Sequence, residues 1–242
     1  MNSSLQRMGE LSCRVVSELP TEASPRLVIL LCHGFGAPGD DLVPLGMEIL
    51  RARPDLREQV AFVFPAAPIA LEQPIAFDSR AWWPIDMERL MISDDEERAQ
   101  HLRSHAPPLL PKAFQKLEST RTAVQQQFEI DSTQLIVGGF SQGAMLTTEL
   151  ALACGQALAG LAIFSGTLLD QDRWTRLSAE CPSLRIIQSH GQQDPILPFS
   201  NAEALYTLLR QHHDVSFLPF PGVHTIPPQA LEALVELIDE QL

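Results

Sequence analysis

The chain has 242 residues, of which 45% are apolar, and a formal net charge of −13. This length and apolar content suffice for one sizeable core and predict a single domain over residues 1–242. So acidic a chain is expected to repel nucleic acid and anionic membrane surfaces, and its apolar stretches are too short to cross a bilayer. We therefore expect neither a nucleic-acid partner nor stable membrane insertion.

The N-terminus and the cysteines bear on the compartment. Residues 1–11 lack the apolar run that a secretory signal needs. The four cysteines are scattered, without the spacing of a disulfide framework or a zinc site. They are Cys13, Cys32, Cys154 and Cys181. We expect a cytoplasmic protein with reduced and mostly buried thiols.

Short apolar runs that alternate with helical patterns predict the fold class. The run at 26–32 is almost continuously apolar, as in a strand buried on both faces of a parallel sheet. Further strands are predicted at 60–64, 134–138, 161–164, 184–188 and 215–218. Helices are predicted at 42–52, 111–128, 141–153, 199–212 and 229–242. The alternation indicates an α/β fold with a mainly parallel central sheet and helices on both faces.

One region interrupts the alternation. Residues 65–84 are rich in proline and apolar side chains and include Trp82 and Trp83, and an acidic run after Ser93 indicates a helix start with Ser93 as its N-cap. Long excursions between strands are often lids or binding loops, so residues 65–111 are expected to flank an active site. A packed surface loop with two core tryptophans is an equally favoured interpretation.

The segment Gly139-Phe-Ser-Gln-Gly143 matches the G-x-S-x-G pattern of a nucleophile elbow. It directly follows a predicted strand and opens a predicted helix, which is the context that the elbow requires. Glycine is needed at both outer positions because the sharp turn brings the backbone close to its neighbours. The helix N-terminus also offers N–H groups to an oxyanion. The pattern predicts Ser141 as a catalytic nucleophile.

A serine nucleophile needs a base, and the base needs an orienting acid. In this kind of fold both follow the serine, with the acid first. His224 is the histidine that follows the last predicted strand, whereas His212 and His213 end a helix and are expected to face water or cap its carbonyls. Asp194, just past the fifth predicted strand, is the preferred acid. Its rivals are Asp170, Asp172 and Asp214.

Two backbone N–H groups are expected to stabilise the oxyanion. One belongs to Gln142, directly after the nucleophile, and the other to the loop after an early strand. That loop contains His33-Gly-Phe-Gly36, where the N–H of Phe35 is the candidate. His33 itself lies too near the early strand to be the catalytic base and is expected to brace the loop through hydrogen bonds.

These motifs together resemble the phospholipase/carboxylesterase family of the α/β-hydrolases, which includes the acyl-protein thioesterases. Five segments carry the resemblance, at 32–36, 81–83, 139–143, 190–195 and 222–224. It implies a seven- or eight-stranded sheet without a large cap domain, and cleavage of carboxylic esters or thioesters without a metal or cofactor. It implies that Ser141, Asp194 and His224 form the triad, with Phe35 and Gln142 as oxyanion donors. It also implies that Leu197 lies near the acyl chain and that Trp82 flanks the same groove.

Departures from the family pattern leave the substrate open. Residues 37–39 separate the early glycines from Asp40, Ala144 stands where a further glycine is common, and the stretch 86–111 is longer than in compact members. The apolar loop residues Ile69, Leu71 and Ile75 predict a groove for short to medium aliphatic acyl chains.

Other interpretations use the same sequence. The enzyme could instead cleave esters of acetylated carbohydrates or of aromatic acids, since the triad would be the same. A non-catalytic ligand-binding relative would have lost a triad or elbow residue, and none is lost here. A metal-dependent hydrolase would use His101 and His105, which share one helix face, although a solvated face is favoured for them. A homodimer is compatible with the sequence.

Overall fold

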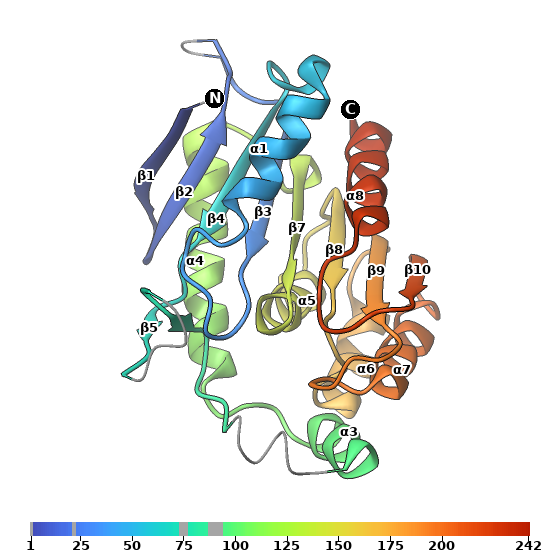
Figure 1. Cartoon of the computed structure of the whole chain (residues 1–242). Coiled ribbons are helices and arrows are strands. Elements are labelled where there is room, and N and C mark those ends of the chain that lie inside the picture. Colours follow the sequence, from blue (N-terminus) through green and yellow to red (C-terminus); the bar gives the residue numbers. More distant parts are fainter. Residues whose placement is uncertain (1, 21–22, 73–76, 87–93) are drawn as a thin grey trace.

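A single large sheet organises the chain in the computed structural model, which describes residues 2–20, 23–72, 77–86 and 94–242. Its strands are β1 (Asn2–Met8), β2 (Leu11–Ser17), β3 (Leu27–Cys32), β4 (Val60–Pro65), β7 (Leu135–Phe140), β8 (Gly160–Phe164), β9 (Arg185–Gly191) and β10 (Asp214–Phe220). Their order in the sheet is β1-β2-β4-β3-β7-β8-β9-β10 (Figure 1). β2 runs antiparallel to β1 and β4, and the other neighbouring pairs are parallel. The predicted mainly parallel sheet is confirmed.

Helices cover both faces of this sheet (Figure 1). One face carries α1 (Val43–Ala52) and α8 (Pro228–Gln241). The other carries α4 (Leu110–Phe128), α5 (Gln142–Ala153), α6 (Gln171–Glu180) and α7 (Phe199–Leu209). Their apolar side chains pack against the sheet in two separate core clusters, one on each side. Because β3 and β4 contribute residues to both clusters, every residue of these two strands is buried, which explains their continuous apolar sequences.

The sequence patterns missed the β1–β2 hairpin and α6. The β1 sequence NSSLQRM holds no apolar run, and β2 alternates buried and exposed residues as an antiparallel strand with one solvated face does. In α6 only Trp174 and Ser178 are buried, so its apolar stripe is too sparse to stand out. Both elements are held in place by tertiary contacts more than by their own pattern.

The parallel strands all end at one edge of the sheet, the lower edge in Figure 1. The described parts of the 65–111 excursion reach the same edge (Figure 1). The excursion contains the helix α3 (Asp95–Ser104) and a two-stranded sheet made of β5 (Ile69–Ala70) and β6 (Arg80–Ala81). Outside it, short 3-10 helices occur at Pro54–Leu56 and Ser132–Gln134. The N-cap of α3 is Asp94, whose side chain accepts the Glu97 N–H at 2.9 Å; the predicted N-cap, Ser93, lies outside the described residues.

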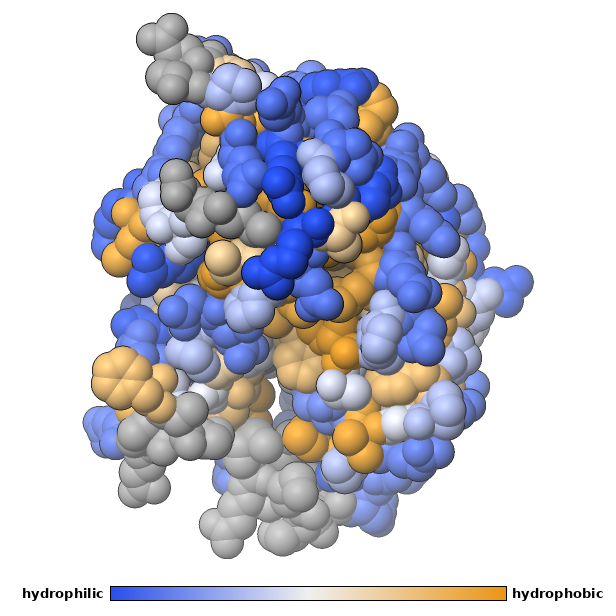
Figure 2. Space-filling model, turned by 45° about the horizontal axis from the view of Figure 1, so that its top comes forward, coloured by the Kyte–Doolittle hydropathy of each residue, from blue (hydrophilic) through white to orange (hydrophobic). Residues whose placement is uncertain are grey.

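Polar residues cover much of the face of the molecule that Figure 2 shows. Figure 2 shows one face that is largely hydrophilic, with apolar residues between the polar ones near its middle. Among the described residues, the large apolar side chains that are exposed are Leu5, Phe77, Leu109 and Val223. No helix in the described part of the chain combines the length and the apolar character that a bilayer-spanning segment needs. Most apolar side chains are therefore used in the two core clusters.

Candidate active site

Ser141 occupies the sharp turn between β7 and α5. Its backbone has φ 53° and ψ −118°, a left-handed conformation. Such a conformation costs a residue with a side chain about 1–3 kcal/mol and is concentrated at functional sites. The Ser141 N–H donates to the Phe164 carbonyl at 2.9 Å. A Cβ on Gly143 would lie 2.1 Å from the Cys32 carbonyl oxygen, and one on Gly139 would lie 2.4 Å from it, so only glycine fits on either side of the turn.

His224 and Asp194 form a close pair at the same edge. His224 Nδ1 lies 2.6 Å from Asp194 Oδ2, while Asp194 Oδ1 accepts the N–H groups of Ile196 at 2.8 Å and Leu197 at 2.9 Å. Burial alone would raise the pKa of Asp194, but the hydrogen bond and charge of His224 and the two N–H donors outweigh it and hold that pKa below its usual value. An ionised Asp194 only accepts, so His224 Nδ1 carries a hydrogen and Nε2 is free to take up a proton.

The loop that carries His224 packs against the serine turn. The His224 ring lies 4.8 Å from the ring of Phe140, the residue before Ser141. Ser165 Oγ donates to the Thr225 carbonyl at 2.9 Å, which ties the same loop to the end of β8. Within the described residues no hydrogen bond joins Ser141 to His224. Such catalytic bonds are often long without substrate and shorten when it binds.

The two predicted oxyanion donors belong to backbone segments next to Ser141. Gln142 is the first residue of α5, so its N–H has no partner inside the helix. Phe35 follows β3 in a loop that passes beside the turn, where a Cβ on Gly34 would lie 3.4 Å from the Ser141 Cβ. In the described part of the chain, no protein acceptor engages either N–H. Both groups are therefore available to a negatively charged oxygen.

The side chain of Gln142 has a role that the sequence reasoning missed. Its Nε2 donates to the Trp83 carbonyl at 2.8 Å, and its Oε1 accepts the Trp82 N–H at 2.9 Å. Trp82 Nε1 in turn donates to the His33 carbonyl at 2.9 Å. These bonds tie the serine turn, the excursion and the loop after β3 together. The available signal for this role was the polar side chain of Gln142 at the buried start of a helix.

His33 braces the loop after β3, as predicted. Its Nε2 accepts the Ala67 N–H at 3.0 Å, so Nδ1 carries the hydrogen and donates to the Gly34 carbonyl at 2.8 Å. The side chain is buried, and burial lowers the pKa of His33 to about 4. A neutral imidazole with both nitrogens engaged is a structural residue.

The expectation that His213 faces water or caps the carbonyls of its helix is wrong. His213 is buried, with Nε2 3.0 Å from Ser178 Oγ, and its Nδ1 accepts the Leu184 N–H at 3.3 Å. Burial lowers its pKa to about 4. The residue links the end of α6 to the start of β9 because α6, which was not predicted, covers it.

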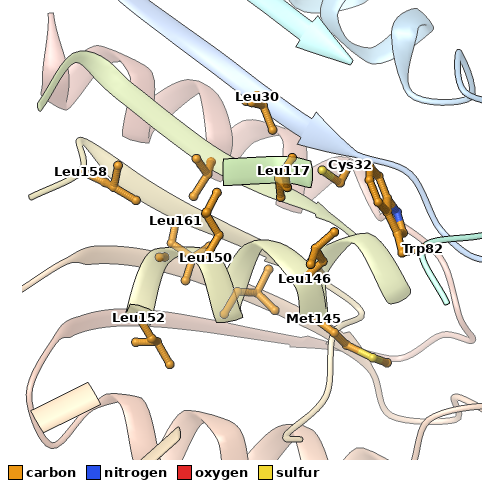
Figure 3. Close-up of a cluster of buried hydrophobic side chains, with 14 of the residues drawn as sticks. Leu30, Cys32, Trp82, Leu117, Met145, Leu146, Leu150, Leu152, Leu158 and Leu161 are labelled. Atoms are coloured by element: carbon orange, nitrogen blue, oxygen red, sulfur yellow. The ribbon is translucent and has the colours of Figure 1, made fainter. Parts of the chain in front are cut away.

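A cavity of about 630 Å³ is lined by Met145 and Leu197, while Ser141, Asp194 and His224 are not among its described lining residues. Met145, one turn beyond Ser141 on α5, and Leu197, just after Asp194, form its wall nearest the triad. Apolar residues line much of the rest, together with polar residues of α3 and its C-cap: Trp83, Ile85, Leu102, Leu169, Gln100, His101, Ser104 and His105. Figure 3 shows Met145 leaving α5 in a different direction from Leu146. The volume is typical of a small-molecule site.

The predicted substrate-binding residues differ in their placement. Leu197 lines the cavity, whereas Trp82 is 1% exposed, packs in the core beside Cys32 (Figure 3), and is not among the described lining residues. Trp83, its neighbour, lines the cavity while also being buried. The excursion thus combines core tryptophans with a cavity wall. Ile75 lies outside the described residues.

The two histidines considered for a metal site are exposed: His101 lies on α3 and His105 is its C-cap, with ring centroids 5.0 Å apart. Across the described residues, no three His, Cys, Asp or Glu side chains come together in a way that could hold a metal ion. The exposure of both rings agrees with the favoured interpretation of this pair as part of a solvated face. Both rings also border the cavity.

Comparison with known proteins identifies the family of the chain. The phospholipase/carboxylesterase family model matches residues 13–242. The chain belongs to this family. The prediction of an α/β-hydrolase that cleaves carboxylic esters or thioesters is thereby confirmed at the level of the family.

Individual relatives agree over almost the full length. The chain is similar to acyl-protein thioesterase 1 of Gibberella zeae, with 26% identity over 92% of this chain and 94% of the relative, and to that of Eremothecium gossypii, with 28% identity over 96% and 95%. Among solved structures, esterase PE8 superposes with a TM-score of 0.76 at 25% identity, over 94% of this chain and 97% of that one. A carboxylesterase from Mesorhizobium loti has the same fold, with a TM-score of 0.71 at 17% identity and 99% coverage of both chains.

Proposed function

We propose that Ser141, His224 and Asp194 are the catalytic triad of this ester hydrolase. Ser141 Oγ attacks the carbonyl carbon and gives its proton to His224 Nε2, while Asp194 stabilises the imidazolium. The N–H groups of Phe35 and Gln142 bind the oxyanion. The tetrahedral intermediate then expels an alkoxide or thiolate, which takes the proton from His224. Water, activated by His224, hydrolyses the acyl-enzyme and releases the acid.

One observation carries this proposal. A strained, half-buried serine lies at the N-terminus of α5, at the same sheet edge as a histidine whose Nδ1 is 2.6 Å from a buried carboxylate. The fully hydrogen-bonded carboxylate fixes the tautomer that leaves Nε2 free to act as a base. A structural role alone would not require the strained turn, the ordered pair and the two unengaged N–H groups at one place.

We infer that the substrate is an ester or thioester with a short to medium aliphatic acyl chain. The apolar wall next to the triad, formed by Met145, Leu197 and Trp83, supports an acyl chain in the 630 Å³ cavity. The names of the acyl-protein thioesterase relatives support a thioester among the substrates. The polar wall that α3 supplies favours, as the second candidate, an ester of an acetylated carbohydrate or of an aromatic acid.

The test compares the wild type with Ser141→Ala on p-nitrophenyl esters from acetate to palmitate and on thioesters of matched acyl length. We expect turnover that peaks at one chain length and falls by at least about a thousandfold in the variant. Ser12→Ala, which alters an exposed serine on β2, is the matched control and should turn over like the wild type. Undiminished turnover by Ser141→Ala would refute the assignment, and a peak with aromatic or sugar esters would favour the second candidate.

Three further expectations stay predictions. They are a single domain over residues 1–242, a cytoplasmic location and a homodimer. The one sheet that bears both core clusters supports the first of them.

A further inference from the structure

His190 is a buried histidine at the end of β9, four residues before Asp194, and the proposed chemistry gives it no role. Its side chain has no exposed surface, and its ring lies 6.2 Å from that of Phe199. Its Nε2 lies 3.0 Å from the Leu197 carbonyl oxygen and 3.3 Å from Asp194 Oδ2. A carbonyl oxygen only accepts, so Nε2 must carry a hydrogen and is the donor.

Asp194 Oδ1 thus accepts two hydrogen bonds, and Asp194 Oδ2 has a histidine nitrogen at 2.6 Å and another at 3.3 Å. Oδ1 accepts the Ile196 and Leu197 N–H groups, and Oδ2 lies next to His190 Nε2 as well as His224 Nδ1. His190 Nε2 donates its hydrogen to the Leu197 carbonyl and so holds the 194–197 turn, whose N–H groups bind Asp194 Oδ1. Since both side chains are fully buried, water has no access to replace this donor.

Burial lowers the pKa of His190 despite its hydrogen bond to Leu197 and the nearby charge of Asp194. A neutral donor orients Asp194 without adding a positive charge that would repel the imidazolium formed on His224 during the reaction. The two histidines therefore have different roles. His224 transfers the proton, and His190 holds the acid that orients His224.

We propose that His190 is a positioning residue that holds the 194–197 turn, and with it the Asp194 carboxylate, toward His224. This inference rests on the proposed triad. When the donor is lost, the carboxylate and the 194–197 turn gain freedom, so His224 is less often in the productive tautomer and orientation. The effect falls on the chemical step and not on binding of the acyl chain, because His190 does not line the cavity among the described residues.

The test uses His190→Phe, which keeps a ring beside Phe199 and removes the donor, and His190→Gln, which restores an N–H donor. We expect kcat of His190→Phe to fall about 10- to 100-fold with KM changed less than about twofold, and His190→Gln to recover most of the loss. His213→Phe is the matched control, since it removes another buried histidine away from the triad and should lower stability with kcat unchanged.

Wild-type kcat in His190→Phe would overturn the proposal, as would an equal loss in His190→Gln when both variants are folded. If neither variant folds, the wild-type chain still decides the matter. An imidazole ¹H–¹⁵N NMR spectrum should show neutral His190 with its hydrogen on Nε2, and a hydrogen on Nδ1 alone would refute it. Failure of the proposed function is distinguishable, because it appears as turnover that persists in Ser141→Ala.

Discussion

Ser165 Oγ donates a hydrogen bond to the carbonyl of Thr225 at 2.9 Å, so the residue after β8 holds the loop that carries His224. Ser165 itself has φ 47°, a left-handed conformation that favours glycine. It is fully buried. Glycine would adopt this backbone conformation with less strain than serine. Serine adds only a Cβ and a hydroxyl group to glycine, so the hydroxyl group is what Ser165 contributes in return for the strain.

This relationship gives the first prediction. Ser165→Gly relieves about 1 kcal/mol of backbone strain, which offsets much of the lost hydrogen bond, so the free energy of unfolding should stay within about 1 kcal/mol of the wild type. kcat should nevertheless fall about 3- to 10-fold because the His224 loop is less well held. Ser165→Ala should lose the same factor in kcat and more stability. Steady-state kinetics and urea denaturation measure both, and a normal kcat in the two variants would contradict the role.

Asp194→Asn tests the orientation of the acid. The Ile196 and Leu197 N–H groups select the amide oxygen of the new side chain, so its NH₂ group must face His224. Two donors then oppose each other, which forces His224 into the tautomer with a hydrogen on Nε2 that cannot act as a base. We expect kcat to fall by about 10³- to 10⁴-fold while the fold is kept. A loss below about tenfold would count against Asp194 as the acid.

Met145→Ala tests the assignment of the cavity. The substitution enlarges the cavity one turn from Ser141, so kcat/KM for longer acyl chains should rise. Each further buried methylene contributes about 0.8 kcal/mol, roughly fourfold in kcat/KM. The matched control is Leu146→Ala, which removes a neighbouring core residue that does not line the described cavity. Both variants should lose about 2–5 kcal/mol of stability, but only Met145→Ala should shift the chain-length optimum. An identical optimum in all three proteins would refute the cavity as the acyl site.

Stability should fall in acid because of His33 and His213. Burial lowers the pKa of each to about 4 from an ordinary value of 6.5, so below 6.5 the unfolded chain binds more protons than the folded one. Their contribution is therefore complete above about pH 6.5 and is lost as the pH falls toward about 4, by up to about 3 kcal/mol for each residue. Urea denaturation across this range measures the slope. His213→Asn, which keeps an acceptor for the Leu184 N–H, should reduce the slope, and an unchanged slope would argue against this assignment.

Much of the fold could be read from the sequence because the central strands are buried on both faces. β3, β4 and β8 consist of runs of apolar residues, which are typical of strands buried on both faces. Their predicted bounds agree with the structure to within about a residue. The β1–β2 hairpin and α6 could not be read in the same way, since each buries only one side and contacts the core at few positions. Their assignment needed the neighbours that cover them.

The sequence by itself determined the local part of the candidate site. The glycines around Ser141 and the order of Asp194 and His224 after it follow from what a strained turn and a base with its acid require, and this is why the family could be named. Only the tertiary structure decided what surrounds these residues. The Gln142 amide, Ser165 and His190 act through hydrogen bonds between segments distant in the chain or across a turn, and a polar residue's partner is set by three-dimensional proximity, which no periodicity encodes. For the same reason Trp83 and not Trp82 lines the cavity: the direction in which each ring points depends on what Gln142 and His33 hold in place.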